Sequence, residues 1–479
     1  MFSEITIDKK KTVYVQLKEY IRQMIIKGIL KSGQKLPSTR ELADILSISR
    51  NTAITAYKCL EDEGFIYTEK AKGAFVQNIS ITCTEAFKLA WKGRITEQAR
   101  LAEELDLMKH GVSWEKGMIS FTSIAPDEKL FNANEFKRAF LDRFSVEGEK
   151  LLNYGYARGY KPLVQYLMKY MEGKGVDVEG KDLIIVNGFT EGFDLMLTAL
   201  CSGRGRIICE NPTHNTAIKI MKLHGLDIAG VDMEDDGINL TQLKEKLSGG
   251  KADLIYTIPS YHNPTGIVTS PEKRVELIKI SKEYEVPVIE DGFNEELRYS
   301  GSHITPLISC CGKGNSVVYV GSFSKVLFPG IRTGWIFGDI ELINYIESLK
   351  RSRNIHTSTI DQAVLFQYFL EGNFGRYIKK AKRVYKHKFE LAKACAEEYI
   401  TYKKALGVGG LHIFLELEQR IDAREVLARC YEKGVVFTPG DIFYTDNKGA
   451  NTLRLGFSRV EDDEIRKGFK IIGEVVAEL

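Results

Sequence analysis

The chain has 479 residues, of which 44% are hydrophobic, and its 67 lysines and arginines against 64 aspartates and glutamates give a net charge of +3. This length favours more than one domain, and the composition is typical of a globular protein, not of a disordered or fibrous one. The sequence shows no apolar run of bilayer length, no signal peptide and no CxxC or zinc-type spacing among its 8 cysteines. We therefore expect a cytoplasmic protein with reduced thiols, no membrane contact and no metal site.

The excess positive charge is confined to the N-terminal segment. Residues 1–77 contain 13 lysines and arginines and 9 aspartates and glutamates, which gives a net charge of +4. The remainder contains 54 lysines and arginines and 55 aspartates and glutamates, which gives a net charge of −1. A basic segment suits a surface that faces phosphates, so this division favours nucleic-acid binding without establishing it.

The N-terminal segment predicts short helices separated by tight turns. Apolar residues at helical spacing predict an amphipathic helix over 12–27. Ser38, followed three residues later by Glu41, is a capping box that starts a helix running to about residue 46. Ser49 can cap a further helix over 50–63. Two short helices around a tight turn form a helix-turn-helix.

The segment FIYTEKAKGAFV then predicts two short strands around a charged tip, which is the form of a wing. On the helix before it we expect Ile54, Tyr57 and Leu60 to pack inward. Short polar side chains and one arginine near its N-terminus would face outward, as reading a major groove requires. The periodicity alone also allows a small three-helix domain with a solvated face.

The stretch LPSTRELADILSISRNTAITAYKCLEDEGFIYTEKAKGAFV resembles the winged helix of the GntR family of bacterial regulators. This resemblance implies double-stranded operator DNA as a partner. It also implies that the DNA is contacted by Arg40, at a phosphate, and by Ser49, Arg50, Asn51 and Thr52. Ala71 departs from the family at the wing, where a glycine is common.

We assign residues 1–77 to the DNA-binding domain, 78–116 to a linker and 117–479 to a large α/β domain. The linker is rich in Ala, Leu, Glu, Lys and Arg over 85–108, which predicts a partly helical, semi-rigid spacer. Beyond it, apolar strand-like runs alternate with amphipathic stretches, a pattern that predicts a mainly parallel sheet with helices on both faces. Ligands of such sheets bind at the carboxyl ends of the strands.

Chemically informative residues follow these runs in order. LIIVN is followed by a Gly-Phe-Thr turn that opens a helix, and a helix N-terminus binds phosphate. Each residue alone has an ordinary structural explanation, since a buried aspartate can cap a turn and a lone histidine usually packs. The ordered set comprises Gly188, Phe189, Thr190, His214, Asn263, Asp291 and Lys325.

This ordered set, together with ISFTSIAP, LLNYGYARGYKPL and LRLGF, resembles class I aminotransferases, which are pyridoxal-phosphate (PLP) enzymes of fold type I. The resemblance covers residues 118–476. It implies a large PLP-binding domain with a mainly parallel sheet, a smaller C-terminal α/β subdomain, PLP as the cofactor, and a homodimer.

The resemblance also implies a role for each residue. Lys325 would form an imine with the cofactor aldehyde, Asp291 would keep the pyridine nitrogen protonated, and Asn263 would donate to the phenolic oxygen. His214 would stack on the ring, and Arg454 would bind a ligand carboxylate. The cofactor phosphate and its turn would be held by Gly188, Phe189, Thr190, Ser322 and Arg332, and by Tyr154 of the partner subunit.

Two departures from the aminotransferase pattern concern turnover. Phe293 stands where a tyrosine usually donates to the cofactor, so we predict a higher imine pKa and slower transimination. Asn294 follows it without restoring that tyrosine. Ser123 and Ile124 replace a glycine pair, which predicts a narrower ligand pocket.

The two halves together resemble the MocR/GabR subfamily of GntR-type regulators. That resemblance implies a PLP-dependent transcriptional regulator that senses an amine or amino acid, acts as a head-to-tail homodimer and has weak or no transaminase activity. One alternative is a working aminotransferase with a fused DNA-binding module. Another is a regulator for which the cofactor itself is the signal.

Overall fold

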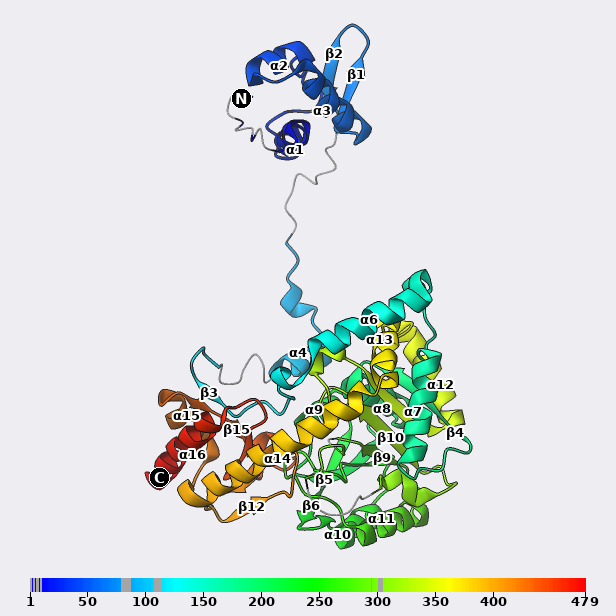
Figure 1. Ribbon diagram of the computed structural model, residues 1–479, viewed down its shortest axis with the longest axis vertical. Helices are drawn as coiled ribbons and strands as arrows, with labels where there is room; N and C mark the ends of the chain where they lie inside the picture. Colours follow the sequence, from blue (N-terminus) through cyan, green and yellow to red (C-terminus); the bar gives the residue numbers. More distant parts are fainter. Residues whose placement is uncertain are drawn as a thin grey trace. The chain divides into compact units, whose positions relative to one another are not determined.

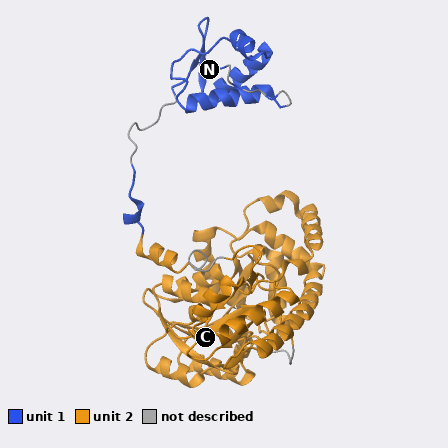
Figure 2. Cartoon of the chain, turned by 90° about the vertical axis from the view of Figure 1, so that its left-hand side faces the viewer, with its two compact units in different colours: residues 1–95 blue, residues 96–479 orange. Residues whose placement is uncertain are grey.

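The computed structural model describes residues 2, 5, 8, 11–78, 88–106, 114–293, 295–299 and 305–479. The chain divides into two compact units, residues 1–95 and residues 96–479 (Figure 2). Part of the predicted helical stretch of the linker and Asn294 lie outside the described residues.

The smaller unit is a helix-turn-helix followed by a β-hairpin (Figure 1). Its elements are α1 (Val13–Ile26), α2 (Thr39–Leu46), α3 (Arg50–Asp62), β1 (Ile66–Glu69) and β2 (Gly73–Val76). Both predicted caps are confirmed. Ser38 Oγ accepts from the Glu41 amide at 3.2 Å, and Ser49 Oγ accepts from the Thr52 amide at 3.1 Å. Because the caps satisfy the free amides at the two helix starts, the turn between α2 and α3 is sharply defined.

One packing prediction for α3 is wrong. Ile54 is 43% exposed, whereas Ala53 and Ala56 are fully buried beside Tyr57 and Leu60. The buried positions follow the i, i+3, i+4, i+7 rule of a helix face. That rule places the face one residue earlier and leaves Ile54 in solvent, because small alanines let α3 approach its neighbours closely.

An eight-stranded sheet organises the larger unit. In pairing order its strands are β4 (Lys181–Val186), β11 (Gly334–Asp339), β10 (Val317–Ser322), β9 (Val288–Asp291), β8 (Leu254–Thr257), β5 (Arg206–Asn211), β6 (Asp227–Glu234) and β7 (Gly237–Ile238). The pairs from β10 through β6 are parallel, whereas β11 is antiparallel to both neighbours and β7 is antiparallel to β6. The predicted, mainly parallel sheet is confirmed.

Helices bury both faces of this sheet (Figure 1). Alternate residues of β4 enter opposite cores, with Leu183 and Ile185 in one and Ile184 and Val186 in the other. The first core includes residues of α7 (Lys161–Gly173), α10 (Leu240–Ser248), α11 (Pro271–Glu283) and α13 (Thr359–Leu370). The second core includes residues of α8 (Gly188–Leu200), α9 (Asn215–Leu223) and α12 (Ile340–Asn354). This double burial explains why the strands are continuous apolar runs.

A smaller α/β subdomain follows the sheet, as predicted. Its antiparallel strands are β12 (Lys404–Leu406), β13 (His412–Glu416), β16 (Thr452–Gly456) and β15 (Thr438–Pro439), and its helices are α15 (Ala423–Glu432) and α16 (Asp462–Ala477). The chain also enters this subdomain early, because β3 (Ile119–Ser120) pairs with β14 (Val435–Val436). The long helix α14 (Asn373–Tyr399) joins both parts, since its first half belongs to the large core and its second half to the small one.

Two further helices lie on the larger unit, and one of them falls within the predicted linker. They are α4 (Glu97–Glu104) and α6 (Ala133–Glu147). α4 packs on α9, where Gln98 Nε2 donates to the Leu223 carbonyl at 2.9 Å. Short 3-10 segments complete the described structure at η2 (Trp91–Gly93), η3 (Glu128–Leu130), η4 (Gly148–Leu152), η5 (Leu307–Cys311), η6 (Pro329–Ile331) and η7 (Gly440–Phe443). None of the described helices combines the length and the apolar character that spanning a bilayer requires.

Candidate functional site

Most of the predicted cofactor-binding residues meet at one cavity of about 220 Å³. It lies where β4, β5, β9 and β10 end, on the side of the sheet that carries their carboxyl termini. Seven predicted residues line this cavity: Phe189, Thr190, His214, Asp291, Ser322, Lys325 and Arg332. Gly188 immediately precedes Phe189 in the chain. Gly292, Phe293, Ser324, Thr216 and Pro329 complete the lining.

Lys325 follows β10 and carries an amine whose environment disfavours charge. Burial, and then the positive charges of Arg454, Arg459 and Arg332, lower the pKa of Lys325 to about 8. A lysine in water would be almost entirely protonated at neutral pH, whereas this one has an appreciable neutral fraction. A neutral amine is the form that attacks a carbonyl.

Asp291 is the last residue of β9 and is 6% exposed. Burial raises the pKa of its carboxyl to about 7, and a hydrogen bond from Tyr256 opposes that rise. Tyr256 Oη donates to Asp291 Oδ2 at 2.9 Å. The sequence analysis missed Tyr256, because only the pairing of β8 with β9 shows that a tyrosine of one strand reaches the aspartate of the next.

An anion-binding cradle forms one end of the cavity. Helix α8 begins at Gly188, whose φ of +78° is in the left-handed region, and a Cβ there would lie 3.0 Å from Arg332 Nη2. The Arg332 guanidinium donates to the Asn187 carbonyl at 2.8 Å and to Ser324 Oγ at 3.3 Å. Glycine therefore lets the arginine lie against the helix N-terminus, where amide dipoles and a fixed positive charge together favour a phosphate.

His214 lies at the N-cap of α9, next to Phe189, with 5.1 Å between the ring centroids. Burial lowers the pKa of His214 to about 3, so its ring is neutral near pH 7. A neutral aromatic ring in a cavity wall is suited to stacking on a flat ligand.

Asn263 and Arg454 form a buried polar pair beside this cavity. Arg454 Nη1 donates to Asn263 Oδ1 at 2.9 Å, while Asn263 Nδ2 is buried without a hydrogen-bond partner among the described residues. Burial lowers the pKa of Arg454 to about 9. No carboxylate in the described part of the chain forms an ion pair with it, although it also donates to the Thr122 carbonyl at 3.2 Å. A buried guanidinium without an anion and a buried amide N–H without an acceptor both cost free energy unless a ligand provides the missing partner.

Tyr154 is not part of this cavity in its own chain. It follows η4 and is 84% exposed, like its neighbours Leu152 and Tyr156. These three exposed side chains lie close together along the chain.

The predicted DNA-contacting residues lie at the start of α2 and α3. Arg40, Ser49, Arg50 and Asn51 are exposed, and Thr52 is half-buried. Ser49 Oγ and Thr52 Oγ1 are hydrogen-bonded at 2.8 Å, so their side chains are partly engaged in the cap.

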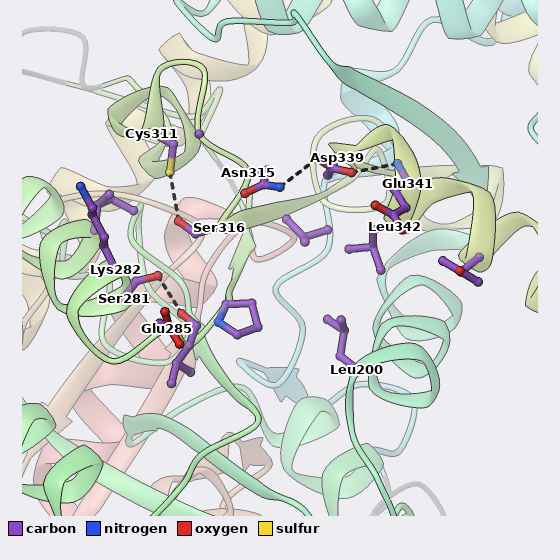
Figure 3. Close-up of a pocket in the computed structure, with 16 residues that line it drawn as sticks. Leu200, Ser281, Lys282, Glu285, Cys311, Asn315, Ser316, Asp339, Glu341 and Leu342 are labelled. Atoms are coloured by element: carbon purple, nitrogen blue, oxygen red, sulfur yellow. Dashed lines mark hydrogen bonds between the residues drawn. The ribbon is translucent and has the colours of Figure 1, made fainter.

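A second, larger cavity of about 780 Å³ contains none of the predicted residues (Figure 3). It is lined by residues that precede β9 and β10, among them Glu285 and Ser316, and by Leu342 of α12. Asn315 donates across it to Asp339 at 3.0 Å. This cavity therefore lies at the amino ends of the strands, away from the candidate site.

Three features of the site fit PLP. The amide of Asn263, which has no acceptor among the described residues, suits a phenolic oxygen, and the cradle of Gly188 and Arg332 suits a phosphate. The amine of Lys325, whose pKa is lowered, suits an aldehyde. A comparison with known proteins agrees with this chemistry. The chain matches the family "Aminotransferase class I and II" over residues 118–472 and "Bacterial regulatory proteins, gntR family" over residues 13–76.

Individual relatives fall into both groups. The chain is 30% identical over 352 residues to aromatic-amino-acid aminotransferase 1 of Thermococcus litoralis. The aligned region covers 72% of this chain and 84% of that protein. It is 26% identical over 490 residues to the uncharacterized HTH-type transcriptional regulator YdfD of Bacillus subtilis, and the match covers 98% of each chain.

A solved structure shows the same fold with a pyridoxyl ligand. The alpha-aminoadipate aminotransferase LysN of Thermus thermophilus, complexed with N-(5'-phosphopyridoxyl)-L-leucine, has a TM-score of 0.74 and 26% identity, and covers 81% of this chain and 99% of that chain. The fold, the cavity and these matches agree that the chain belongs to the PLP-dependent class I and II aminotransferase family and carries an N-terminal DNA-binding domain of the gntR family.

Proposed function

We propose that this protein is a PLP-dependent, DNA-binding transcriptional regulator whose aminotransferase-like domain recognises an amine or amino acid. Residues 1–77 would read DNA, 78–116 would connect, and 117–479 would sense. The observation that carries this proposal is one chain that joins a helix-turn-helix with exposed Arg50 and Asn51 to a cavity holding the low-pKa amine of Lys325.

The residues of the cavity would divide the work of binding. Bound PLP supplies an aldehyde that exchanges amines and a ring that withdraws electrons. Lys325 would supply the neutral amine that holds the cofactor. Asp291 would keep a proton on the ring nitrogen, and Asn263 Nδ2, which has no hydrogen-bond partner among the described residues, would donate to the phenolic oxygen. Arg332 and the N-terminus of α8 would bind the phosphate.

The effector we propose has a carboxylate as well as an amine. Arg454 is buried, is in contact with Asn263 and lacks an anionic partner among the described residues. A buried guanidinium of this kind binds a ligand carboxylate with two parallel N–H···O bonds. An amino acid or a γ-amino acid has both groups.

Phe293 favours sensing over turnover. It lines the cavity directly after Asp291 and Gly292, where it has no hydroxyl to give to the cofactor. The loss of one donor leaves PLP binding intact and slows the exchange chemistry, which suits a receptor that holds its effector. A fused aminotransferase remains the second candidate, because seven of the predicted cofactor-binding residues line one cavity and the chain is 30% identical to an aminotransferase.

We further propose that the protein acts as a homodimer on operator DNA. Leu152, Tyr154 and Tyr156 are 65%, 84% and 79% exposed, which is consistent with a surface that a second copy covers. Tyr154 would then reach the phosphate in the partner's cavity, in a head-to-tail arrangement. A DNA-reading protein of this family would work in the bacterial cytoplasm, where the chromosome is.

One experiment separates the candidates. An operator fragment is selected from a random DNA pool with the full-length protein, and its affinity is measured by fluorescence anisotropy with and without PLP and a panel of amino acids. A regulator changes operator affinity when an amino acid is added to the PLP-loaded protein, and it transfers the amino group at most once. Repeated transfer to 2-oxoglutarate with unchanged DNA affinity supports the enzyme instead, and a response to PLP alone supports a cofactor sensor.

A further inference from the structure

Asp291 is a carboxylate in an environment that opposes its charge. The side chain is buried, and two further carboxylates, Glu210 on β5 and Glu295 after β9, add to the rise in its pKa. A neutral Asp291 could not hold a proton on a pyridine ring, because it would have none of the negative charge that stabilises a pyridinium. The site therefore needs a group that keeps Asp291 ionised.

The two neighbouring carboxylates have donors of their own. Glu210 accepts from Thr257 Oγ1 at 2.6 Å and from the Ile258 amide at 2.8 Å. Glu295 pairs with Lys174 at 2.6 Å. In the described part of the chain, Tyr256 is the one residue that donates a hydrogen bond to the Asp291 carboxylate.

The sheet determines the position of Tyr256. In the parallel pair β8–β9, Tyr256 lies opposite Ile289, and Asp291 is two residues further along the same face. The tyrosine ring is fully buried and packs against Phe193, with 4.9 Å between centroids. Burial also raises the pKa of Tyr256 well above its ordinary value, so its hydroxyl keeps its proton and remains a donor.

We infer that Tyr256 is a positioning residue of the cofactor site: its hydroxyl binds Oδ2 of Asp291, keeps the carboxylate ionised and leaves Oδ1 for the N–H of a pyridine ring. The inference rests on the proposed binding of PLP. It assigns a function to a residue that lies behind the cavity wall and does not line the cavity.

The charged groups of the cavity itself do not replace this donor. Lys325, His214 and Arg332 line the same cavity, but the structure shows no hydrogen bond from any of them to Asp291 among the described contacts. A hydrogen bond to an ionised acceptor is stronger than one between neutral groups. Its loss should therefore change the ionisation of Asp291 more than it changes the packing of the strand.

The test is the pH dependence of PLP binding by the full-length protein, followed through the visible absorbance of the bound cofactor. Tyr256→Phe removes the hydroxyl and keeps the ring. We expect it to weaken PLP binding about tenfold at pH 6.5 and to approach the wild-type affinity by pH 8.5, because Asp291 then ionises without help. Tyr368→Phe is the matched control, since it removes a buried hydroxyl without a partner among the described residues, in the core on the opposite face of the sheet.

A second variant separates ionisation from packing. In a protein that already carries Asp291→Asn, adding Tyr256→Phe should not weaken PLP binding further, because there is no carboxylate for the tyrosine hydroxyl to keep ionised. A loss that is the same at every pH, or that persists with Asp291→Asn, overturns the inference and makes Tyr256 a packing residue. Wild-type affinity of Tyr256→Phe at every pH overturns it as well. If the wild-type protein itself binds no PLP, both the proposed function and this inference about Tyr256 are wrong.

Discussion

Arg454 is a buried cation without an anionic partner among the described residues. The guanidinium is 7% exposed and lies over the ring of Phe443 at 4.8 Å, yet its hydrogen bonds go to neutral acceptors. Taking such a charge out of water costs several kcal/mol unless an anion compensates it. In the proposed function, the side chain would therefore add to the affinity for a ligand carboxylate.

Replacing this charge should affect ligands selectively. Arg454→Met should weaken binding of an amino acid by about 2 to 5 kcal/mol, because its carboxylate loses a buried partner. The amine without the carboxylate should bind both proteins equally. Spectral titration of the PLP-loaded protein with an amino acid and its decarboxylated analogue measures both affinities. Equal losses for the two ligands would show that the variant damages the whole site.

Lys325 makes a prediction about pH. Below its pKa of about 8 the amine is mostly protonated, and protonation removes the lone pair that attacks the aldehyde. The rate of PLP capture should therefore rise about tenfold per pH unit up to about pH 8 and then level off. Stopped-flow absorbance follows this rate, and Lys325→Ala is the control that should show no covalent capture after borohydride. A rate that climbs steadily to pH 10 would mean that the lysine has an ordinary pKa.

Phe293 can be tested by restoring the missing hydroxyl. Phe293→Tyr should lower the pH midpoint of the cofactor's visible band and speed the transfer of one amino group, because a donor to the phenolic oxygen stabilises its charged form. Single-turnover kinetics and a spectral pH titration measure the two effects. A midpoint equal to that of the wild type would show that the new hydroxyl does not reach the cofactor.

At the scale of elements, the short helix α4, which falls within the predicted linker, packs on the larger unit through α9. It has an N-cap at Thr96, whose hydroxyl accepts from the Ala99 amide at 3.3 Å, and no buried side chain of its own. Gln98 provides a polar contact with α9 through its hydrogen bond to the Leu223 carbonyl. A helix of this length is only marginally stable without tertiary contacts.

Weakening that contact should therefore loosen α4 alone. Gln98→Ala should increase amide hydrogen exchange over residues 97–104 while leaving exchange in α9 and PLP affinity unchanged. Glu104→Ala, at an exposed position of α4 itself, is the control for the effect of an alanine on the helix. Unchanged exchange in α4 would show that packing alone, without this hydrogen bond, holds the helix on α9.

At the scale of the whole molecule, the proposed dimer predicts that each cavity is completed by a residue of the other subunit. If Tyr154 completes the phosphate site of the partner subunit, Tyr154→Phe should weaken PLP binding although the residue lies outside its own cavity.

Mixed dimers make this prediction decisive. A chain with Tyr154→Phe and a chain with Lys325→Ala should together form one intact site, so mixing them should restore PLP capture to about a quarter of all sites under random exchange. Borohydride reduction followed by mass spectrometry counts the labelled chains. Labelling no greater than that of the Tyr154→Phe chain alone would show that the sites do not share residues.

Local patterns in the sequence were sufficient for much of the fold. The capping box at Ser38 and the cap at Ser49 predicted where α2 and α3 begin, because helix N-termini depend on residues within one turn. Apolar runs alternating with amphipathic stretches predicted the mainly parallel sheet, because strands buried on both faces are apolar along their length. Ile54 shows the limit, since a helical pattern with small alanines allows two neighbouring faces and only packing selects one.

The sequence was enough to predict which residues end the strands around the cavity and, through its resemblance to two known families, that a DNA-reading module precedes an aminotransferase-like domain. The folded chain was needed to show that Tyr256 meets Asp291, that Arg454 lies beside Asn263 without an anion, and that Tyr154 lies outside its own cavity. The physical reason is distance along the chain: Asn263 and Arg454 are 191 positions apart. Motif spacing describes neighbours in sequence, whereas hydrogen bonds, burial and the resulting pKa shifts depend on neighbours in space.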